Sequence, residues 1–346
     1  MPTAVPYHRN SDNESEASEG HSNPAEDDYA EFSRDGSPSL LELEADDFPT
    51  YFTEREGRLF HSSTSPYPLP ADAPEQERLK GIHALANQLI GANYTSPVSN
   101  ILAQDPNRQK NVLDLCTGTG TWVMEMAEDF PHILFTGIDI VPIATRYPLP
   151  NVNFEIGDIT EELRWQNALF DFVHARGISL SVHDYRAILP EVIRVLRPGG
   201  IFLSCEWDLG VSFHPDSPHA TETALHAPAS TQFYQVLNAA LESRGIRTVM
   251  SQITGYLHES SAFDDIQPNA FYVPVGTWHD NPRMQDLGRG FLATQSRLAD
   301  SVKPFLKQVG HPQAYVDGLV REFVEELRTT DGLVGTYRLV HGIKSG

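Results

Sequence analysis

The sequence predicts an α/β protein built on a doubly wound, mainly parallel sheet, and three observations support this prediction. From Asn111 onward, short apolar runs alternate with segments of helical periodicity, which is the pattern of βαβ units. The first of these runs passes through a glycine-containing turn into a helix, an arrangement that binds nucleotides in such sheets. The length of 346 residues allows one large core together with additional segments.

The chain begins with an acidic, polar stretch. Residues 1–50 contain 13 Asp and Glu but only two Lys and Arg, and few large apolar side chains precede residue 48. Such a composition buries too little apolar surface to offset the entropy that ordering costs. We therefore predict a disordered acidic tail over residues 1–47.

The charge and the cysteine content of the whole chain exclude several classes of protein. The formal net charge of −22 opposes binding to nucleic-acid phosphates and to anionic membranes. Cys116 and Cys205 are too few for a disulfide framework, and no stretch has the apolar length of a signal-peptide core or a membrane span. We expect a soluble protein of the cytoplasm, the nucleus or both, without direct contacts to nucleic acid or membrane.

Residues 48–110 are expected to form a lead-in to the sheet and a helix that caps it. Aromatic residues and prolines in 48–70 favour an irregular segment packed on a domain. Asp72, followed three residues later by Glu75, is typical of a helix N-terminus. The helix is predicted over about 73–91, with its apolar face made by Leu79, Ile82, Leu85, Ala86, Leu89 and Ile90.

The sheet domain is predicted over 111–346. Its first helix runs from about 120 to Phe130, where Pro131 stops it, and its second begins at Asp184 and ends before Arg197-Pro-Gly-Gly200. The predicted strands are 111–115, 133–138, 152–156, 169–174 and 201–206.

Beyond residue 206 the periodicity is mainly helical. Three amphipathic helices are expected around Phe233–Leu241, Met284–Leu298 and Tyr315–Leu327. Two further strands, 270–275 and 336–342, flank the last two of these helices and are expected to be neighbours in the sheet. We predict helical insertions near 210–250 and 281–328 that cover the ligand site.

The segment from Val112 to Trp122 carries the clearest chemistry. Asp114 lies near the end of a strand, and Gly118 and Gly120 in the following turn let the backbone approach a ligand closely. Asp139 ends the second strand, where a carboxylate binds both hydroxyls of a ribose. The spacing therefore predicts a cofactor that contains a nucleoside.

The same segment also discriminates between nucleoside cofactors. A dinucleotide fingerprint that starts at Gly118 requires a small residue at position 123, which is Val123. Asp114 would repel a pyrophosphate but suits an ammonium and a sulfonium group. We therefore favour S-adenosylmethionine (SAM) and keep an NAD(P)-dependent oxidoreductase as an alternative.

The chain resembles the class I SAM-dependent methyltransferases and, in particular, the fungal LaeA-like (TAM-domain) group. The similarity covers about 50–343 and includes Tyr67-Pro-Leu-Pro-Ala-Asp72 and Glu75-Gln-Glu-Arg-Leu79 in the lead-in. The shared motifs are LDLCTGTGTW at 113–122, GIDIVPI at 137–143, FDFVHAR at 170–176 and RVLRPGG at 194–200. The resemblance implies a seven-stranded Rossmann-like sheet with an antiparallel last strand, and SAM-dependent methyl transfer to a small molecule of secondary metabolism.

The resemblance also assigns roles to residues. It assigns Asp114 and the 116–120 turn to the methionine part of SAM, although Cys116 stands where the family has glycine, and Asp139 to the ribose. It assigns Asp158 to the adenine amino group. A candidate catalytic role falls on His174 beside the transferred methyl group. The cofactor-binding residues it implies are Asp114, Cys116, Gly118, Gly120, Asp139, Ile140, Asp158, Ile159, His174, Ala175 and Arg176.

Several alternatives stay open on the sequence alone. Asp158 also fits a cap ahead of Glu161, His174 a packed core residue, and Arg176 either an anchor for an acidic substrate or a partner of Asp171 or Glu206. The protein is either an enzyme or a LaeA-like regulatory or scaffold protein that binds SAM with little turnover in a complex with protein partners. No His spacing suggests a metal site, so we expect no metal.

Overall fold

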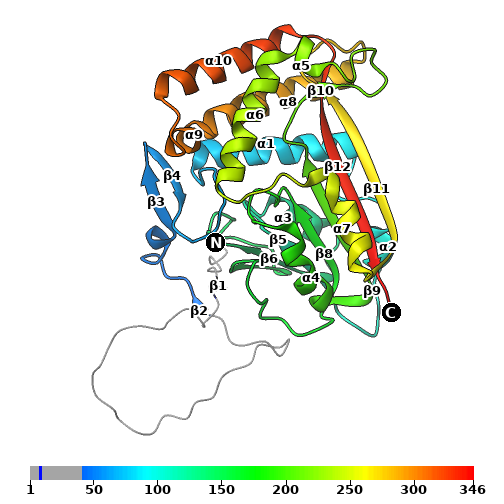
Figure 1. The fold of residues 1–346 in the computed structure, drawn as a ribbon. Coiled ribbons are helices and arrows are strands. Elements are labelled where there is room, and N and C mark those ends of the chain that lie inside the picture. Colours follow the sequence, from blue (N-terminus) through cyan, green and yellow to red (C-terminus); the bar gives the residue numbers. More distant parts are fainter. Residues whose placement is uncertain (1–7, 10–40) are drawn as a thin grey trace, which may run out of the picture.

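The computed structural model describes residues 8–9 and 41–346, and one ten-stranded sheet organises this part of the chain (Figure 1). Seven longer strands follow the order β7-β6-β5-β8-β9-β12-β11. The first five are parallel, whereas β12 is antiparallel to both β9 and β11, so the predicted fold class is confirmed. These strands are β5 (Lys110–Leu115), β6 (Ile133–Asp139), β7 (Val152–Ile156), β8 (Phe170–Arg176), β9 (Leu196–Trp207), β11 (Phe263–Pro274) and β12 (Leu333–Lys344).

Burial on both faces explains why the central strands could be found in the sequence. Val112, Leu113 and Leu115 of β5 are at most 1% exposed, and six of the seven residues of β8 are buried. Strands of this kind read as continuous apolar runs, because helices cover both faces of a parallel sheet. The predicted bounds of β5, β6, β7 and β8 agree with the structure to within two residues.

The helices between these strands begin and end close to where their local signals predict. α3 (Thr121–Asp129) follows Gly120, and a short 3₁₀ turn from Tyr185 continues into α4 (Leu189–Val195). β9 starts at Leu196, five residues earlier than expected. The Arg197–Gly200 stretch therefore ends the helix but also belongs to the strand, where it forms the irregularity between the residues that pair with β8, Leu196 and Ile201.

α1 (Ala73–Ile90) confirms the predicted capping helix. The Asp72 side chain accepts a hydrogen bond from the Glu75 backbone N–H, and Gly91 ends the helix in the left-handed conformation. α1 packs against α8 (Pro282–Ser301), about 200 residues later in the chain. A buried hydrogen bond of 2.6 Å from the Ser301 hydroxyl to Glu75 joins the two helices.

A helical layer gathers at one end of the molecule (Figure 1). Its core includes Phe233 of α6 stacked on Phe323 of α10, with ring centroids 4.0 Å apart. As predicted, the two helices α8 and α10 lie in the chain between two neighbouring strands, β11 and β12, and the structure adds the short α9 between these helices. Among the described residues, no helix combines the length and the hydropathy needed to cross a membrane. The helices of the layer are α6 (Pro228–Ser243), α8, α9 (Lys303–Gln308) and α10 (Gln313–Thr329).

The sequence analysis missed several smaller elements. The hairpin of β3 and β4 turns at Glu56-Gly57, where both residues have positive φ. α7 packs beside β11, and β10 joins the edge of the sheet through β12. These elements are β3 (Phe52–Arg55), β4 (Arg58–His61), α2 (Val98–Ile101), β10 (Ser212–Phe213), α5 (Thr223–His226) and α7 (Ile253–Ser260).

Most of the predicted acidic tail, residues 1–7 and 10–40, lies outside the described residues. In the part that is described, β1 (His8–Arg9) pairs with both β2 (Leu41–Glu42) and β7. Leu43 is 3% exposed and packs in the core beside β5 and α3. The described fold therefore begins ahead of the predicted boundary at residue 48.

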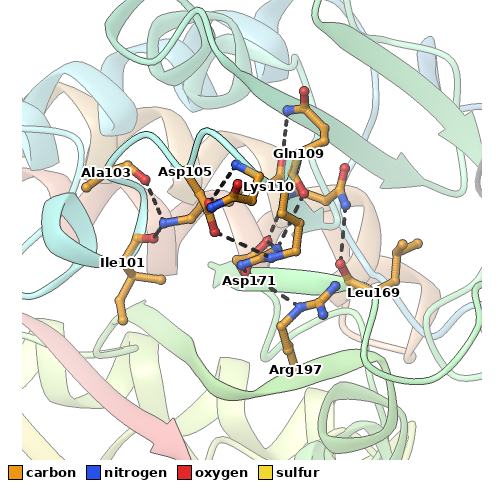
Figure 2. Close-up of polar contacts among 11 residues, drawn as sticks. Ile101, Ala103, Asp105, Gln109, Lys110, Leu169, Asp171 and Arg197 are labelled. Atoms are coloured by element: carbon orange, nitrogen blue, oxygen red, sulfur yellow. Dashed lines mark hydrogen bonds and ion pairs between the residues drawn. The ribbon is translucent and has the colours of Figure 1, made fainter.

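The amino ends of β5 and β8 are fixed by a cluster of charged groups (Figure 2). Asp171, 4% exposed, accepts two hydrogen bonds from Arg108, at 2.6 and 2.8 Å, and Arg197 lies 3.7 Å away. Lys110 donates to the carbonyl oxygens of Ile101 and Ala103. Buried charges persist when they are paired in this way, so this edge of the sheet is structural.

Candidate cofactor and acceptor site

A cavity lies at the opposite edge of the sheet, where the parallel strands end. Its lining falls into two parts. The β5–β7 half comprises lining residues from segments 114–122, 139–143 and 157–159. The β8–β9 half comprises lining residues from segments 176–181 and 206–209 together with Met250, Gln295 and Leu298. Residues of 61–71 and of α1 close over both halves.

The two glycines of the turn after β5 have different roles. Both have positive φ, which glycine adopts without strain. A Cβ atom on Gly118 would meet only Leu79 of α1, at 4.0 Å, so the backbone is open to the cavity there. A Cβ atom on Gly120 would lie 2.5 Å from the Phe154 ring, and Gly120 does not line the cavity. Gly120 is therefore required for packing against Phe154, and its expected role in cofactor binding stays a prediction.

Asp139 ties the turn to the end of β6. Its Oδ2 accepts a hydrogen bond of 2.7 Å from the Gly118 N–H, and its Oδ1 accepts one of 3.2 Å from the Val141 N–H. Burial raises the pKa of Asp139 to about 6, although these backbone donors oppose the rise. Each oxygen retains a lone pair for a ligand hydroxyl.

Cys116 occupies a left-handed conformation with φ of 52°, which an L-residue adopts at a cost. Burial, followed by the nearby Asp139 carboxylate, raises the pKa of the Cys116 thiol well above its usual value. The thiol is therefore protonated and is a poor nucleophile. Its conformation is the one that glycine adopts without strain.

The segment after β7 places Asp158 and Ile159 on the cavity wall. Asp158 Oδ1 accepts hydrogen bonds from both the N–H and the hydroxyl of Thr160, at 2.8 and 2.7 Å. Asp158 thus fixes a turn. No helix follows it, so Asp158 caps a turn and not the helix considered from the sequence. Ile140, beside Asp139, also lines this half.

The structure places His174 away from the position expected of a catalytic base. Its ring is 1% exposed, donates from Nδ1 to Asp114 at 2.7 Å, and stacks on Trp122 with centroids 3.7 Å apart. Burial lowers the pKa of His174, while Asp114 opposes this change. Neither His174 nor Ala175 lines the cavity. His174 instead orients Asp114, which does line it.

Arg176 links three elements over the cavity. Its guanidinium donates to His83 Nδ1 of α1 at 2.8 Å, and His83 Nε2 lies 3.0 Å from Glu125 of α3. Burial and Arg176 lower the pKa of His83, whereas Glu125 raises it. Arg176 therefore pairs with neither of the partners considered from the sequence, Asp171 or Glu206.

The β8–β9 half contains a carboxylate that the sequence analysis considered only as a partner of Arg176. Glu206 is 3% exposed, and its Oε1 accepts hydrogen bonds from the backbone N–H groups of Ile178 and Ser179, at 2.9 and 3.2 Å. Burial raises the pKa of Glu206 to about 8, although the Ser179 side chain and the two backbone hydrogen bonds oppose the rise. Its signal in the sequence was an acidic residue near the end of a buried strand, as for Asp114 and Asp139.

The charges in the cavity fit a cationic ligand better than an anionic one. The lining carboxyl groups are those of Asp114, Asp139, Asp158, Glu206 and Asp208. The two cavity arginines are engaged, because Arg78 donates twice to Glu75 and Arg176 donates to His83. A pyrophosphate would meet uncompensated negative charge, whereas the ammonium and sulfonium of SAM would be stabilised. The open backbone at Gly118 also leaves room beside the turn, so the residues present fit SAM.

One group of potential metal ligands lies outside this cavity. Among the described residues, His219, Glu222 and His226 place one ligand atom each within 4.8 Å of one another. All three are exposed, and Glu222 Oε2 forms contacts of 3.3 and 3.2 Å with the two imidazoles. These contacts account for the grouping without an ion.

Comparisons with known proteins agree with this geometry. A family model described as a methyltransferase domain matches residues 106–244. The chain is 28% identical to the secondary metabolism regulator laeA of Coprinopsis cinerea over 284 residues, which are 80% of this chain and 70% of that protein. It is also 28% identical to the methyltransferase pytC of Aspergillus terreus over 238 residues, 68% of this chain and 69% of that protein.

A solved structure of phosphoethanolamine N-methyltransferase 2 from Haemonchus contortus in complex with SAM is also similar. The match covers 76% of this chain and 56% of that one, with 18% identity and a TM-score of 0.41. The family model, the sequence relatives and the strand order agree: residues 106–244 match a methyltransferase domain, and they lie on the sheet described above.

Proposed function

We propose that this SAM-dependent methyltransferase acts on a small, largely apolar acceptor bound in the β8–β9 half of the cavity. The observation that carries the proposal is that one continuous cavity joins this half to the acidic β5–β7 half. Methyl transfer depends mainly on holding the acceptor in line with the methyl group, and a shared enclosed cavity provides this. Five lining side chains of the β8–β9 half are apolar or aromatic, and they lie beside Arg176, Glu206, Asp208 and Gln295: Leu180, Trp207, Leu209, Met250 and Leu298.

The β5–β7 half is the proposed SAM site. Asp139 would accept hydrogen bonds from the ribose hydroxyls, and Asp158 and Ile159 would contact the adenine. Asp114, held by His174, and the open backbone at Gly118 would hold the charged methionine end. When bound, SAM supplies an electrophilic methyl carbon on a positively charged sulfur, which the surrounding carboxylates stabilise. α1 would exclude water through Leu79, Ile82 and His83, which line the cavity.

Incubation of the purified protein with methyl-labelled SAM and an extract of its own organism tests this function. We expect label in the organic-soluble, low-molecular-weight fraction, and none when Asp139 is replaced by alanine. A thermal shift with SAM or its demethylated product, S-adenosylhomocysteine (SAH), but not with NAD would support the cofactor assignment. Label confined to protein would contradict a small-molecule acceptor.

A second candidate function is regulatory. One relative is named a secondary metabolism regulator, and it matches 80% of this chain. In this function the protein would bind SAM with little turnover and act through a protein partner. Tight SAM binding together with no labelled product in any extract fraction would favour it over the first proposal.

A further inference from the structure

We infer that Glu206 is the catalytic base of this enzyme and that the acceptor group it serves is a hydroxyl on an apolar, aromatic body. The inference rests on the proposed function, since it assumes that the acceptor binds in the β8–β9 half. Within that half, it identifies the reacting group of the acceptor and the side chain that receives its proton.

The position of Glu206 is the first argument. In the sheet order β7-β6-β5-β8-β9, the β5–β7 half lies on one side of β8 and Glu206 lies on the other, at the end of β9. Glu206 lines the same cavity as Asp139 and Asp158. An acceptor in the β8–β9 half would therefore lie between Glu206 and the proposed SAM site.

The state of the carboxylate is the second argument. A buried carboxylate is costly unless a cation pairs with it, yet neither nearby arginine does so. Arg176 donates to His83. Arg338 lies opposite Glu206 in the register of β9 and β12, but its guanidinium bonds to Asp208 at 2.7 and 2.8 Å. Within the part of the chain that the structure describes, Glu206 is thus a buried carboxyl group that pairs with no cation and faces a cavity.

The orientation of the side chain is the third argument. Both backbone hydrogen bonds, from Ile178 and Ser179, go to Oε1. They fix the carboxyl group relative to the loop after β8 and involve no lone pair of Oε2. A purely structural cap of this loop needs no carboxylate that faces an apolar cavity, because a neutral amide oxygen would accept the same bonds.

The chemistry of the acceptor follows from this placement. An amine attacks through its free lone pair, but a neutral hydroxyl is a weak nucleophile and gains from a base that accepts its proton. The pKa of about 8 brings Glu206 within reach of a phenol, whose pKa is near 10. Trp207 and the aliphatic wall fit an aromatic body.

The step balances as follows. The hydroxyl oxygen forms the new bond to the methyl carbon, and the carbon–sulfur bond breaks with its electron pair remaining on sulfur. Glu206 accepts the hydroxyl proton at Oε2 and releases it to water after the product leaves. No oxidant or further reactant is needed.

A matched set of probes tests this inference on the full-length protein loaded with SAH. The probes are 2-naphthol, 2-naphthylamine and naphthalene, which share one apolar body, and binding is measured by calorimetry. At pH 8.5, above the pKa of Glu206, we expect 2-naphthol to bind about tenfold or more tightly than naphthalene, because its hydroxyl bonds to a charged group. Glu206→Gln should reduce this advantage to about threefold or less. Glu325→Gln, an exposed charge change on α10, is the control.

Turnover with labelled SAM gives the second readout. Glu206→Gln should slow methylation of 2-naphthol by about 10²–10⁴-fold, the usual contribution of a base, with SAM affinity changed by less than about fivefold. Equal binding of 2-naphthol and naphthalene, no binding of any probe, or full activity of the glutamine variant would each overturn the inference. Failure of the unmodified protein to bind SAM would instead overturn the proposed function, so the two failures are distinguishable.

Discussion

The two halves of the cavity are assembled in different ways. The β5–β7 half comes from three short segments, each directly after a strand, and it uses backbone groups and strand-end carboxylates such as Asp139. The β8–β9 half combines residues as far apart in the chain as Glu206, Met250 and Leu298. The first is a local product of strand endings, whereas the second exists only after the helical layer has packed on the sheet. A site for an invariant cofactor can therefore be encoded locally, while acceptor specificity depends on tertiary packing.

α1 covers both halves, so its removal should produce the largest effect. Leu79 approaches Gly118, and His83 holds Arg176. We expect deletion of residues 1–92 to abolish SAM binding or solubility. The matched control is deletion of 1–40, which keeps the buried Leu43 and should leave SAM affinity unchanged. A thermal-shift titration measures both, and normal SAM binding by the shorter protein would show that the halves form without α1.

Asp139→Ala should show most clearly that SAM affinity depends on the β5–β7 half more than on the β8–β9 half. The lost hydrogen bonds to a charged group should weaken SAM binding by about 1.5–3 kcal/mol, or roughly 10–150-fold. Met250→Ala, in the β8–β9 half, should change SAM affinity by less than about twofold. Calorimetry with each variant checks this contrast. A comparable loss in both variants would mean that SAM binding depends on the whole cavity.

The two halves should also differ in how their buried carboxyl groups make the free energy of unfolding depend on pH. The folded pKa of Glu206, about 8, lies above the ordinary value of 4.5, so its contribution to stability is fully present below pH 4.5 and is lost as the pH rises through 8. The side chains of Tyr185, Cys205 and Tyr337 stay neutral across this range, because burial raises their pKa values. Two further charged side chains, Arg176 and Asp208, line the cavity in the same half as Glu206.

Glu206→Gln should therefore make the ligand-free protein more stable at pH 9, by on the order of a few kcal/mol. At pH 5 the two proteins should differ little. Asp139, with a pKa of about 6, accounts for part of the remaining pH dependence. Chemical denaturation at several pH values measures the free energy of unfolding, and identical profiles for the two proteins would show that Glu206 is not desolvated.

Cys116→Gly should have the smallest effect. The left-handed conformation costs an L-residue about 1–2 kcal/mol, whereas glycine brings an entropy cost of about 0.5–1 kcal/mol. We expect stability within about 1 kcal/mol of the parent protein and SAM affinity equal or tighter. A large loss of SAM affinity in calorimetry would give the thiol a role in the β5–β7 half.

The sequence predicted the elements that depend on local signals. Strands buried on both faces and helices with clear caps, such as α1 after Asp72, lie close to their predicted positions. β11 begins seven residues earlier than expected, because its first part is a polar, exposed edge that pairs with β12 through a bulge. Nothing in a local apolar pattern identifies such an edge.

The same distinction applies to the site. Asp139 and Gly118 line the cavity, and their contacts to a cofactor stay a prediction. His174 does not line it, and its place in FDFVHAR, which looked like a strand end, lies two residues inside β8. Glu206 was undervalued because its surroundings, the loop after β8 and the helical layer, come from other parts of the chain.

The contact between α1 and α8 has a consequence for how the chain acquires its structure during synthesis. α1 leaves the ribosome early, but Ser301, the partner of Glu75, follows 226 residues later. Until then the apolar face of α1 has no final surface to cover, and contacts of such long range are slow to form. The sheet can assemble in sequence order from β5 to β9 in the meantime. The enclosed cavity is thus among the last parts of the molecule to exist, so a nascent or truncated chain would present an open sheet edge rather than a methyl-transfer site.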